Sequence, residues 1–301
     1  MSTVHHHICP VCSSAAIHPA LTVKDHSVSG DYFVIWACRD CTVRFTQDAP
    51  DEVSIGAYYQ SPNYISHSNT RKGLVNRLYQ QVRNYTLRQK ARLIGRFASD
   101  KGRVLDIGAG TGAFLNTMKA KGWQTIGLEP DAGARAQAQA LYQLQLGDPR
   151  DLAALTEHSF DAVTMWHVLE HVHPLHAYLE RIKDLLRADG RLVVAVPNYS
   201  SLDSAIYGLY WAAYDVPRHL YHFTPRSMDV LMQRHQLKIV AKKRMWFDSF
   251  YISLLSSKYR KGHTGWAGAF INGLRSDIRA WVNKDSCSSI VYIIEKDHRS
   301  N

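Results

Sequence analysis

One stretch, Val104-Leu-Asp-Ile-Gly-Ala-Gly-Thr-Gly-Ala-Phe-Leu115, limits what this chain can fold into more than any other. A short apolar run with an acid near its end leads into glycines at alternate positions, and the apolar spacing then becomes helical at Phe114, Leu115 and Met118. The pattern predicts a strand, a tight turn and the start of a helix. Glycines suit such a turn because it needs unusual backbone angles and because a bulky ligand must approach the backbone there.

Two classes of ligand use this device. Gly108-x-Gly110-x-x-Ala113 fits the dinucleotide fingerprint, with Glu129 about 20 residues further on as the acid for the ribose. Asp106 separates the classes, because a carboxylate beside the loop repels a pyrophosphate but suits a ligand that carries an ammonium and a sulfonium. Together with Gly108, Gly110 and Gly112 it completes an acid-x-Gly-x-Gly-x-Gly motif. At this motif the sequence resembles class I S-adenosylmethionine (SAM) dependent methyltransferases, over roughly residues 100–245.

The resemblance implies a doubly wound, Rossmann-like α/β fold with a seven-stranded sheet whose last strand is antiparallel. Apolar patterning predicts strands at 104–107, 122–129, 144–148, 160–166, 191–196, 237–241 and 289–295. It predicts helices at 73–98, 113–121, 131–141, 178–186 and 225–236.

The resemblance also implies which side chains hold SAM. Asp106 would take the methionine ammonium, and Glu129 would accept both ribose hydroxyls, as two acceptor oxygens suit a vicinal diol. Asp148 matches the position that faces the adenine amino group, although a turn acid that caps the residues before Leu152 fits the same spacing. Trp166, at the end of a predicted strand, should lie against the cofactor.

Two close cysteine pairs, Cys9-Pro-Val-Cys12 and Cys38-Arg-Asp-Cys41, precede this region. Four thiolates in two Cys-x2-Cys pairs suit tetrahedral Zn²⁺, and with every position taken by cysteine the zinc should be structural. Four reduced thiols without a metal are the alternative. The run His5-His6-His7 is expected to be a disordered start rather than a set of further ligands.

A second cluster of chemistry follows the predicted strand at 160–166. The run His167-Val-Leu-Glu-His171 lies where open α/β sheets place their active groups. Its Leu-Glu-His resembles the ubiquinone-biosynthesis O-methyltransferases, in which Glu-x-x-Glu-His can hold a divalent cation. Here His167 replaces the first acid, which disfavours Mg²⁺ because that ion prefers oxygen ligands. The alternative is that Glu170 and His171 orient the loop by hydrogen bonds.

An insertion at 199–223 is rich in aromatic residues, which suit the wall of a substrate pocket and can face a cationic sulfonium. Arg218 is a candidate to hold an acidic group of the acceptor. The candidate general bases are His219, His222 and His171, because imidazole titrates near working pH. A second insertion at 245–285 mixes apolar and basic residues, as a peripheral membrane contact or a helical flap would.

Charge separates the flanks from the centre of the chain. The net charge is +10, with −1 in residues 101–200 and +11 in the remainder. An anionic partner would therefore meet the flanks, although net charge also serves solubility. The longest apolar run is too short to cross a bilayer, and without a secretory signal the expected location is the cytoplasm.

The predicted organisation is a zinc-ribbon module at 1–48, a linker and basic helix at 49–100, and a SAM-binding domain at 101–301 with the two insertions. The predicted function is SAM-dependent O-methylation of a small molecule, lipid or glycan precursor. The alternatives are an RNA methyltransferase that uses the basic flanks and ribbon, and a non-catalytic SAM-binding protein.

Overall fold

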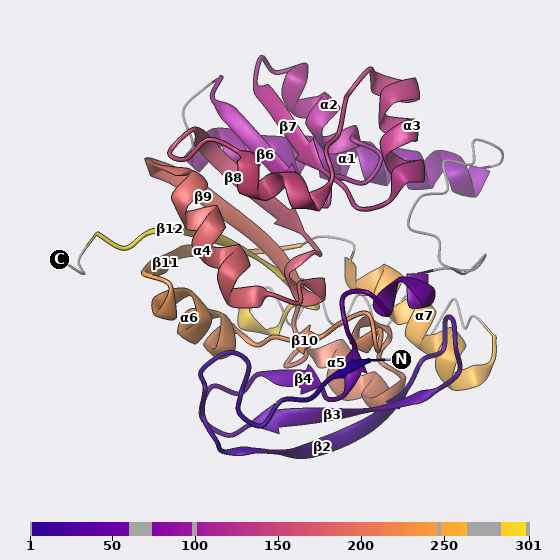
Figure 1. The fold of residues 1–301 in the computed structure, drawn as a ribbon. Coiled ribbons are helices and arrows are strands. Elements are labelled where there is room, and N and C mark those ends of the chain that lie inside the picture. The colour runs from indigo at the N-terminus through magenta and orange to yellow at the C-terminus, as the bar shows by residue number, and fades with distance from the viewer. Residues whose placement is uncertain (1, 60–73, 98–100, 246–247, 264–283, 299–301) are drawn as a thin grey trace. The chain divides into compact units, whose positions relative to one another are not determined.

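The computed structural model describes residues 2–59, 74–97, 101–245, 248–263 and 284–298 (Figure 1). Its strands are β1 (Thr3–Val4), β2 (Ile17–Lys24), β3 (Tyr32–Cys38), β4 (Arg44–Thr46), β5 (Ala49–Pro50), β6 (Arg103–Ile107), β7 (Gln124–Leu128), β8 (Phe160–Trp166), β9 (Leu186–Pro197), β10 (Tyr221–His222), β11 (Leu237–Arg244) and β12 (Ser289–Lys296). Its α-helices are α1 (Leu74–Phe97), α2 (Ala113–Lys119), α3 (Ala132–Tyr142), α4 (Leu175–Leu185), α5 (Leu202–Tyr207), α6 (Pro225–Arg234) and α7 (Asp248–Lys261). Short 3₁₀ helices are η1 (Ile55–Tyr59), η2 (Pro149–Ala154), η3 (Leu169–His171), η4 (Gly208–Tyr210), η5 (Ala212–Tyr214) and η6 (Lys284–Ser286).

The predicted α/β fold is confirmed, with one strand fewer than expected. Six strands are hydrogen bonded in the order β11-β12-β9-β8-β6-β7. The segment 144–148, predicted as a strand, makes only a single parallel bridge between Gly147 and Leu128. Its prediction as a full strand is wrong because Asp148 ends the extended stretch by capping η2 directly after it.

The strand directions match the expected mixed sheet. β6 pairs in parallel with both β7 and β8. At the far end of β9, Asn198 N donates to Ser288 O, and at its beginning Leu186 O accepts from Lys296 Nζ. The first residues of β12 therefore lie beside the end of β9, which makes β12 the antiparallel last strand.

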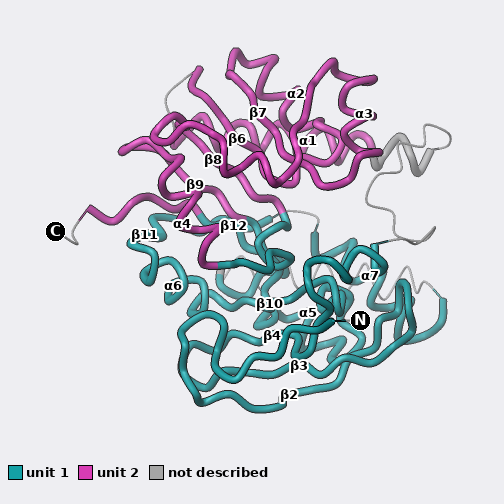
Figure 2. Tube along the Cα trace, in the orientation of Figure 1, with its two compact units in different colours: residues 1–64, 167–175, 195–292 teal, residues 65–166, 176–194, 293–301 magenta. Residues whose placement is uncertain are grey.

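The chain forms two compact units, shown in different colours in Figure 2. Unit 2 comprises residues 65–166, 176–194 and 293–301, and contains β6, β7, β8 and helices α1 to α3. β8 is buried through most of its length, as expected for a strand that is covered on both faces. Helix α2 approaches β7 closely, since a Cβ added at Gly127 would lie 2.4 Å from Leu115 Cδ1.

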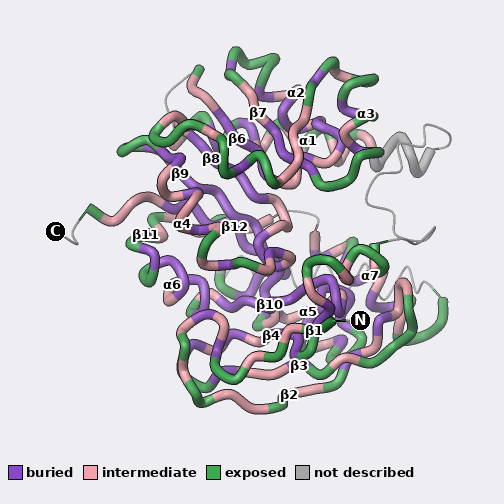
Figure 3. The backbone as a smooth tube through the Cα atoms, in the orientation of Figure 1, coloured by how far each residue is buried: buried purple, intermediate pink, exposed green. Residues whose placement is uncertain are grey.

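Unit 1 comprises residues 1–64, 167–175 and 195–292. Its four-stranded sheet has the order β10-β4-β3-β2, so a strand of the 199–223 insertion extends the N-terminal sheet, with Tyr221 opposite Phe45. Residues of the N-terminal sheet, of the insertion and of α7 share one buried cluster: Val23, Ile35, Tyr207, Trp211, Ala212, Ala213, Tyr214, Val216 and Ile252. Figure 3 colours the buried stretches of the chain purple. The N-terminal residues therefore belong to a core that they share with the insertion and with α7.

Several sequence expectations concern the ends and connections of the chain. The expected disordered start is wrong, because β1 pairs with β5 and His5 Nδ1 lies 2.7 Å from Asp48 Oδ1. The segment Tyr59-Gln-Ser-Pro-Asn-Tyr64 is expected from the sequence to fold over the ligand as a lid, but only Tyr59 of it is described. Residues 246–247 and 264–283 of the second insertion also lie outside the described residues. The domain boundaries remain a prediction. Within the described part of the chain, no helix has the length and apolar character needed to cross a membrane.

Candidate cofactor and acceptor sites

The glycine loop between β6 and α2 has the backbone that the sequence predicts. Its φ angles are 71° at Gly108, 54° at Gly110 and 74° at Gly112, in the region that side-chain-bearing residues rarely adopt. At Gly112 space is limiting as well, since an added Cβ would lie 3.1 Å from Leu144 Cδ1 and 3.2 Å from Ala138 Cβ. This turn therefore requires glycine for both conformation and packing.

Asp106 lies on β6 immediately before this loop and is almost fully buried. Thr164 Oγ1, on the neighbouring β8, donates a hydrogen bond of 2.5 Å to Asp106 Oδ1. Burial raises the pKa of Asp106 to about 7, against the opposing effects of this hydrogen bond and of the Lys90 ammonium. A cationic ligand placed beside Asp106 would favour its ionised form.

Glu129 follows β7 and touches the same loop. Its Oε2 accepts from Gly110 N at 2.7 Å, and its Oε1 accepts from Asp131 N at 3.0 Å. Each carboxylate oxygen retains a lone pair after these bonds, so the group can still accept from a diol. The structure thus places Asp106, the loop glycines and Glu129 together in unit 2, as the sequence predicts.

Asp148 adopts the geometry of the alternative interpretation. It caps η2 in a reciprocal capping box with Asp151, and it pairs with Arg150 at 2.8 Å. The hydrogen bond from the Arg150 side chain is the main reason that the pKa of Asp148 is lowered to about 2. A role toward adenine remains a prediction.

Trp166 ends β8 in the same unit. The Phe114 and Trp166 rings meet edge to face with their centroids 5.6 Å apart, and Lys90 Nζ lies 4.2 Å from the centroid of the Trp166 ring. Its Nε1 is buried and has no hydrogen-bond partner among the described residues. Contact of Trp166 with a cofactor remains a prediction.

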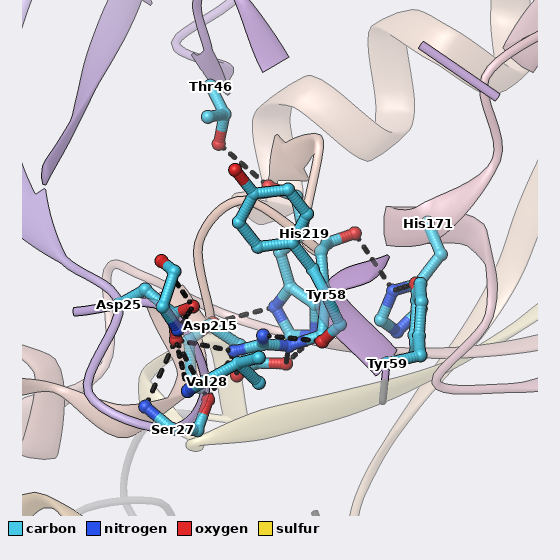
Figure 4. Close-up of polar contacts among 12 residues, drawn as sticks. Asp25, Ser27, Val28, Thr46, Tyr58, Tyr59, His171, Asp215 and His219 are labelled. Carbon is cyan, nitrogen blue, oxygen red and sulfur yellow. Dashed lines mark hydrogen bonds and ion pairs between the residues drawn. The ribbon is translucent and has the colours of Figure 1, made fainter. Parts of the chain in front are cut away.

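The candidate proton-transfer residues lie in unit 1. One ligand atom from each of Glu170, His171 and His219 lies within 4.8 Å of the others. The rings of His171 and His219 meet edge to face, with their centroids 4.6 Å apart (Figure 4). Sequence reasoning groups His171 with Glu170, but His219 joins them only through the fold.

The hydrogen bonds fix the tautomers of the two imidazoles. His219 Nδ1 lies 2.8 Å from Ala213 O, and His171 Nδ1 lies 2.9 Å from Arg218 O. Because a carbonyl oxygen only accepts, each Nδ1 carries the proton and each Nε2 offers a lone pair. Burial, helped by the neighbouring His219, lowers the pKa of His171 to about 4. His171 is therefore a neutral imidazole near pH 7.

Glu170 is the unusual member of this cluster. Its side chain is 0% exposed, and among the described residues neither carboxylate oxygen has a hydrogen-bond partner. His167 Nδ1 lies 3.4 Å from Oε1, which is an ion-pair distance. Burial acts to raise the pKa of Glu170, but the approach of the His167 side chain, together with the neighbouring His219 and His171 rings, outweighs it and the pKa is lowered. A buried carboxylate without hydrogen bonds is costly unless another group neutralises it.

The side chains of Glu170, His171 and His219 provide donor atoms that fit a divalent ion. Two imidazole nitrogens with lone pairs, each ring held by a backbone carbonyl through its other nitrogen, are the usual arrangement of metal-bound histidines. With the Glu170 carboxylate they form a set of two nitrogens and one oxygen, which suits zinc, iron or manganese better than Mg²⁺. The set expected from the sequence contains His167, whereas the structure brings His219 into the cluster in its place.

His222 lies deeper in unit 1. Its Nε2 is 3.3 Å from Thr46 Oγ1, and its ring meets Tyr214 edge to face at 5.3 Å. Burial holds the pKa of His222 well below its ordinary value, with the charges of His219 and Arg44 acting in the same direction. These contacts are those of a packed, neutral core histidine.

The four N-terminal cysteines converge as the sequence predicts. The Sγ atoms of Cys9 and Cys41 lie 3.6 Å apart, and those of Cys12 and Cys38 are also 3.6 Å apart. Tetrahedral Zn²⁺ with Zn–S bonds of about 2.3 Å would separate its sulfurs by about 3.8 Å. The N–H groups of Val11 and Cys12 point to Cys9 Sγ, and the pKa of Cys9 is lowered to about 5, mainly by its hydrogen bond with Cys41. The thiol set therefore fits a zinc ion.

Arg218 does not have the role expected from the sequence. Its side chain is 0% exposed, and the guanidinium binds Asp215 and Asp25 rather than facing an acceptor. Sequence reasoning missed Asp25. It named Tyr59 only as the start of a lid over the ligand and not as a neighbour of His171, whose Nδ1 lies 3.0 Å from the Tyr59 hydroxyl. No local signal marks either residue, because their partners are more than 100 positions away.

The fold and the site in unit 2 define a class of protein. A mixed α/β sheet with an acid before a three-glycine turn, and a second acid after the next strand, is the arrangement of the class I SAM-dependent methyltransferase fold. The family model described as "Methyltransferase domain" matches residues 79–242, and the chain belongs to this family.

The relatives are consistent with this assignment. Over 157 residues the chain is 30% identical to the ubiquinone biosynthesis O-methyltransferase of Rhodopseudomonas palustris strain BisA53, covering 48% of this chain and 62% of that protein. Over 132 residues it is 33% identical to the enzyme of the same description from Xanthomonas oryzae pv. oryzae strain PXO99A, covering 40% and 54%. The chain thus spans little more than half of these relatives. A structure from Galdieria sulphuraria described as a sarcosine dimethylglycine methyltransferase has a TM-score of 0.50 at 11% identity, over 74% of this chain and 88% of that one, which shows the shared fold.

Proposed function

We propose that the protein transfers the methyl group of SAM to an oxygen of a small molecule, a lipid or a glycan precursor. One observation carries the proposal: Asp106, the positive-φ glycine loop and Glu129 converge in unit 2 in the arrangement that a cation-bearing nucleoside requires. The similarity to ubiquinone biosynthesis O-methyltransferases supports oxygen as the acceptor atom.

In this proposal each cofactor-side residue has a defined role. SAM supplies a methyl group that is bonded to a sulfonium. When the methyl group is transferred, the sulfur leaves as a neutral thioether. Asp106 pairs with the methionine ammonium, Glu129 accepts from the ribose, Asp148 faces the adenine, and Trp166 lies against the cofactor. The loop glycines let the ligand approach the backbone. The protein mainly holds acceptor and methyl in line, which is the larger part of such catalysis.

His219 is the proposed general base. As the acceptor oxygen forms its bond to the methyl carbon, the carbon–sulfur electron pair passes to sulfur, and the acceptor proton passes to His219 Nε2. Its Nδ1–H is held by Ala213 O, and Asp215 Oδ2 lies 3.9 Å from Nε2, where a negative charge favours the imidazolium that forms. His171 with its low pKa and the packed His222 are less suited to this step.

Two metals are included in the proposal. Structural Zn²⁺ would be held by Cys9, Cys12, Cys38 and Cys41. A divalent ion at Glu170, His171 and His219 would polarise the acceptor oxygen and lower its pKa, and His219 would then act as a ligand instead of a base. The two interpretations of His219 differ in a measurable way, because in protein whose four-cysteine site keeps its zinc only the metal site predicts a rise in turnover when Mn²⁺ is added.

The test has two parts. Isothermal titration calorimetry should show binding of S-adenosylhomocysteine and no binding of NAD. The Glu129→Ala substitution should weaken the binding of S-adenosylhomocysteine. Incubation of cell extracts with the protein and deuteriomethyl-labelled SAM, followed by mass spectrometry, should yield a labelled methyl ether. NAD binding without S-adenosylhomocysteine binding would refute the proposal. If the label appeared on RNA bases, the acceptor would be RNA instead of a small molecule, a lipid or a glycan precursor.

A further inference from the structure

The N-terminal module reaches the acceptor-side histidines through a buried ion pair. The side chains of Arg218 and Asp25 are both 0% exposed, with Nη2 3.1 Å from Oδ1. Asp25 lies in the turn after β2, and Ser27 N and Ser29 N both donate to its carboxylate. The same guanidinium donates to Asp215 Oδ1 at 2.7 Å. A guanidinium held by two carboxylates at these distances has little freedom to move.

The backbone beside Arg218 is held from another direction by β4. Thr46 Oγ1 donates to His219 O at 2.7 Å, and Thr46 N donates to Leu220 O at 2.9 Å. Figure 4 shows Thr46 bonded on one side of this segment while Asp25 and Ser27 lie on the other. Two parts of the N-terminal sheet therefore fix three consecutive residues, 218–220.

These anchors act directly on two imidazoles. His171 Nδ1 donates to the carbonyl of Arg218, and His219 is the next residue in the chain. A displacement at residue 218 would thus move one imidazole through a hydrogen bond and the other through covalent bonds. Since Asp25 and Thr46 fix residue 218 and its neighbour, the positions of both rings depend on the N-terminal sheet.

We propose that Asp25, acting through Arg218, and Thr46, acting through the His219 carbonyl, are positioning residues for His171 and His219. The N-terminal sheet is on this basis a working part of the acceptor site. The inference rests on the proposed function, because it assumes that these histidines serve the acceptor.

The experiment compares three variants of the full chain labelled with ¹⁵N-histidine. Asp25→Asn keeps the shape of the side chain and removes its charge, and Thr46→Val removes the hydroxyl donor. Asp203→Asn is the matched control, since Asp203 is equally buried in unit 1 but accepts from Trp211 and Ser288. Imidazole NMR signals are assigned with His171→Gln and His219→Gln, and binding of S-adenosylhomocysteine is measured for each variant.

In the wild type both rings should show the Nδ1–H tautomer. Asp25→Asn should abolish this signature at His171, and Thr46→Val should shift the His219 signals, with S-adenosylhomocysteine affinity unchanged within twofold. Asp203→Asn should lower the melting temperature and leave both imidazole signatures as in the wild type. For any acceptor found with labelled SAM, Asp25→Asn should lower kcat at least tenfold at constant KM for SAM.

Unchanged imidazole signals in both Asp25→Asn and Thr46→Val would overturn the proposal, and so would an equal effect of Asp203→Asn. If Asp25→Asn fails to fold, the Thr46→Val result decides. A wild-type protein that shows both tautomer signatures but does not bind S-adenosylhomocysteine would refute the proposed function and leave the positioning claim standing.

Discussion

The raised pKa of Asp106 predicts that cofactor binding depends on pH near neutrality. A pKa of about 7 leaves Asp106 about one tenth ionised at pH 6 and about nine tenths ionised at pH 8. S-adenosylhomocysteine carries the same ammonium as SAM and should bind the ionised form. Its affinity should therefore rise about tenfold between pH 6 and pH 8, which is about 1.4 kcal/mol.

The stability of the protein without ligand should change with pH in the opposite direction to the affinity for the ligand. Because the pKa of Asp106 is raised on folding, its contribution to stability is full below its unfolded pKa of about 3.9 and is lost as the pH rises to about 7. The free energy of unfolding without ligand should fall over this window, while stabilisation by the ligand should grow.

Calorimetry in two buffers of different ionisation enthalpy measures this prediction. At pH 6 binding should release close to one proton, and in Asp106→Asn both the proton release and the pH dependence should vanish. Thr164→Val is an informative companion, since it removes the hydrogen bond that favours ionisation and should move the transition to higher pH. A wild-type affinity that is flat from pH 6 to pH 8, or an Asp106→Asn variant that keeps the wild-type slope, would refute the reasoning.

Three further predictions concern the loop, the cysteines and the base. Gly112→Val should weaken S-adenosylhomocysteine binding at least tenfold, because a branched side chain at φ 74° meets Leu144 and Ala138, and calorimetry measures the loss. Removal of zinc by a chelator should lower the melting temperature of the full chain, with recovery on adding Zn²⁺, and a chelator without effect on melting would contradict a structural ion. His219→Ala should reduce turnover of an identified acceptor by about 100-fold or more with cofactor affinity unchanged, and unaltered turnover would exclude His219 as base or ligand.

The geometry of the candidate cofactor site could be predicted from the sequence because its signals are local. Asp106 and the three glycines lie within seven residues, and a positive φ at each glycine follows from the turn that they form. The helix predicted at 73–98 is likewise confirmed by α1 (Leu74–Phe97). The segment 144–148 failed because apolar alternation reports burial, whereas a strand also requires a hydrogen-bonded neighbour over several residues.

The acceptor half could not be assembled in this way. Its contacts join residues far apart in sequence, such as Thr46 with the His219 carbonyl and Asp25 with Arg218. A histidine in sequence looks the same whether it is a base, a ligand or a packed ring, so the sequence offers His219 first as a base but also His222. Only the structure shows that His222 is packed against Tyr214, while His219 faces His171 and Glu170.

The division of the chain into units makes the two halves separately testable. Every candidate cofactor residue belongs to unit 2, and every candidate proton-transfer residue and zinc ligand belongs to unit 1. One of the points at which the chain passes from one unit to the other lies between Trp166 and His167, and His167 has a φ of 60°, a backbone strain that persists only where surrounding contacts impose it. Substitutions in unit 1 should therefore alter methyl transfer with little change in cofactor affinity, and a variant of Asp25 or His219 that lost S-adenosylhomocysteine binding would show that this separation is wrong.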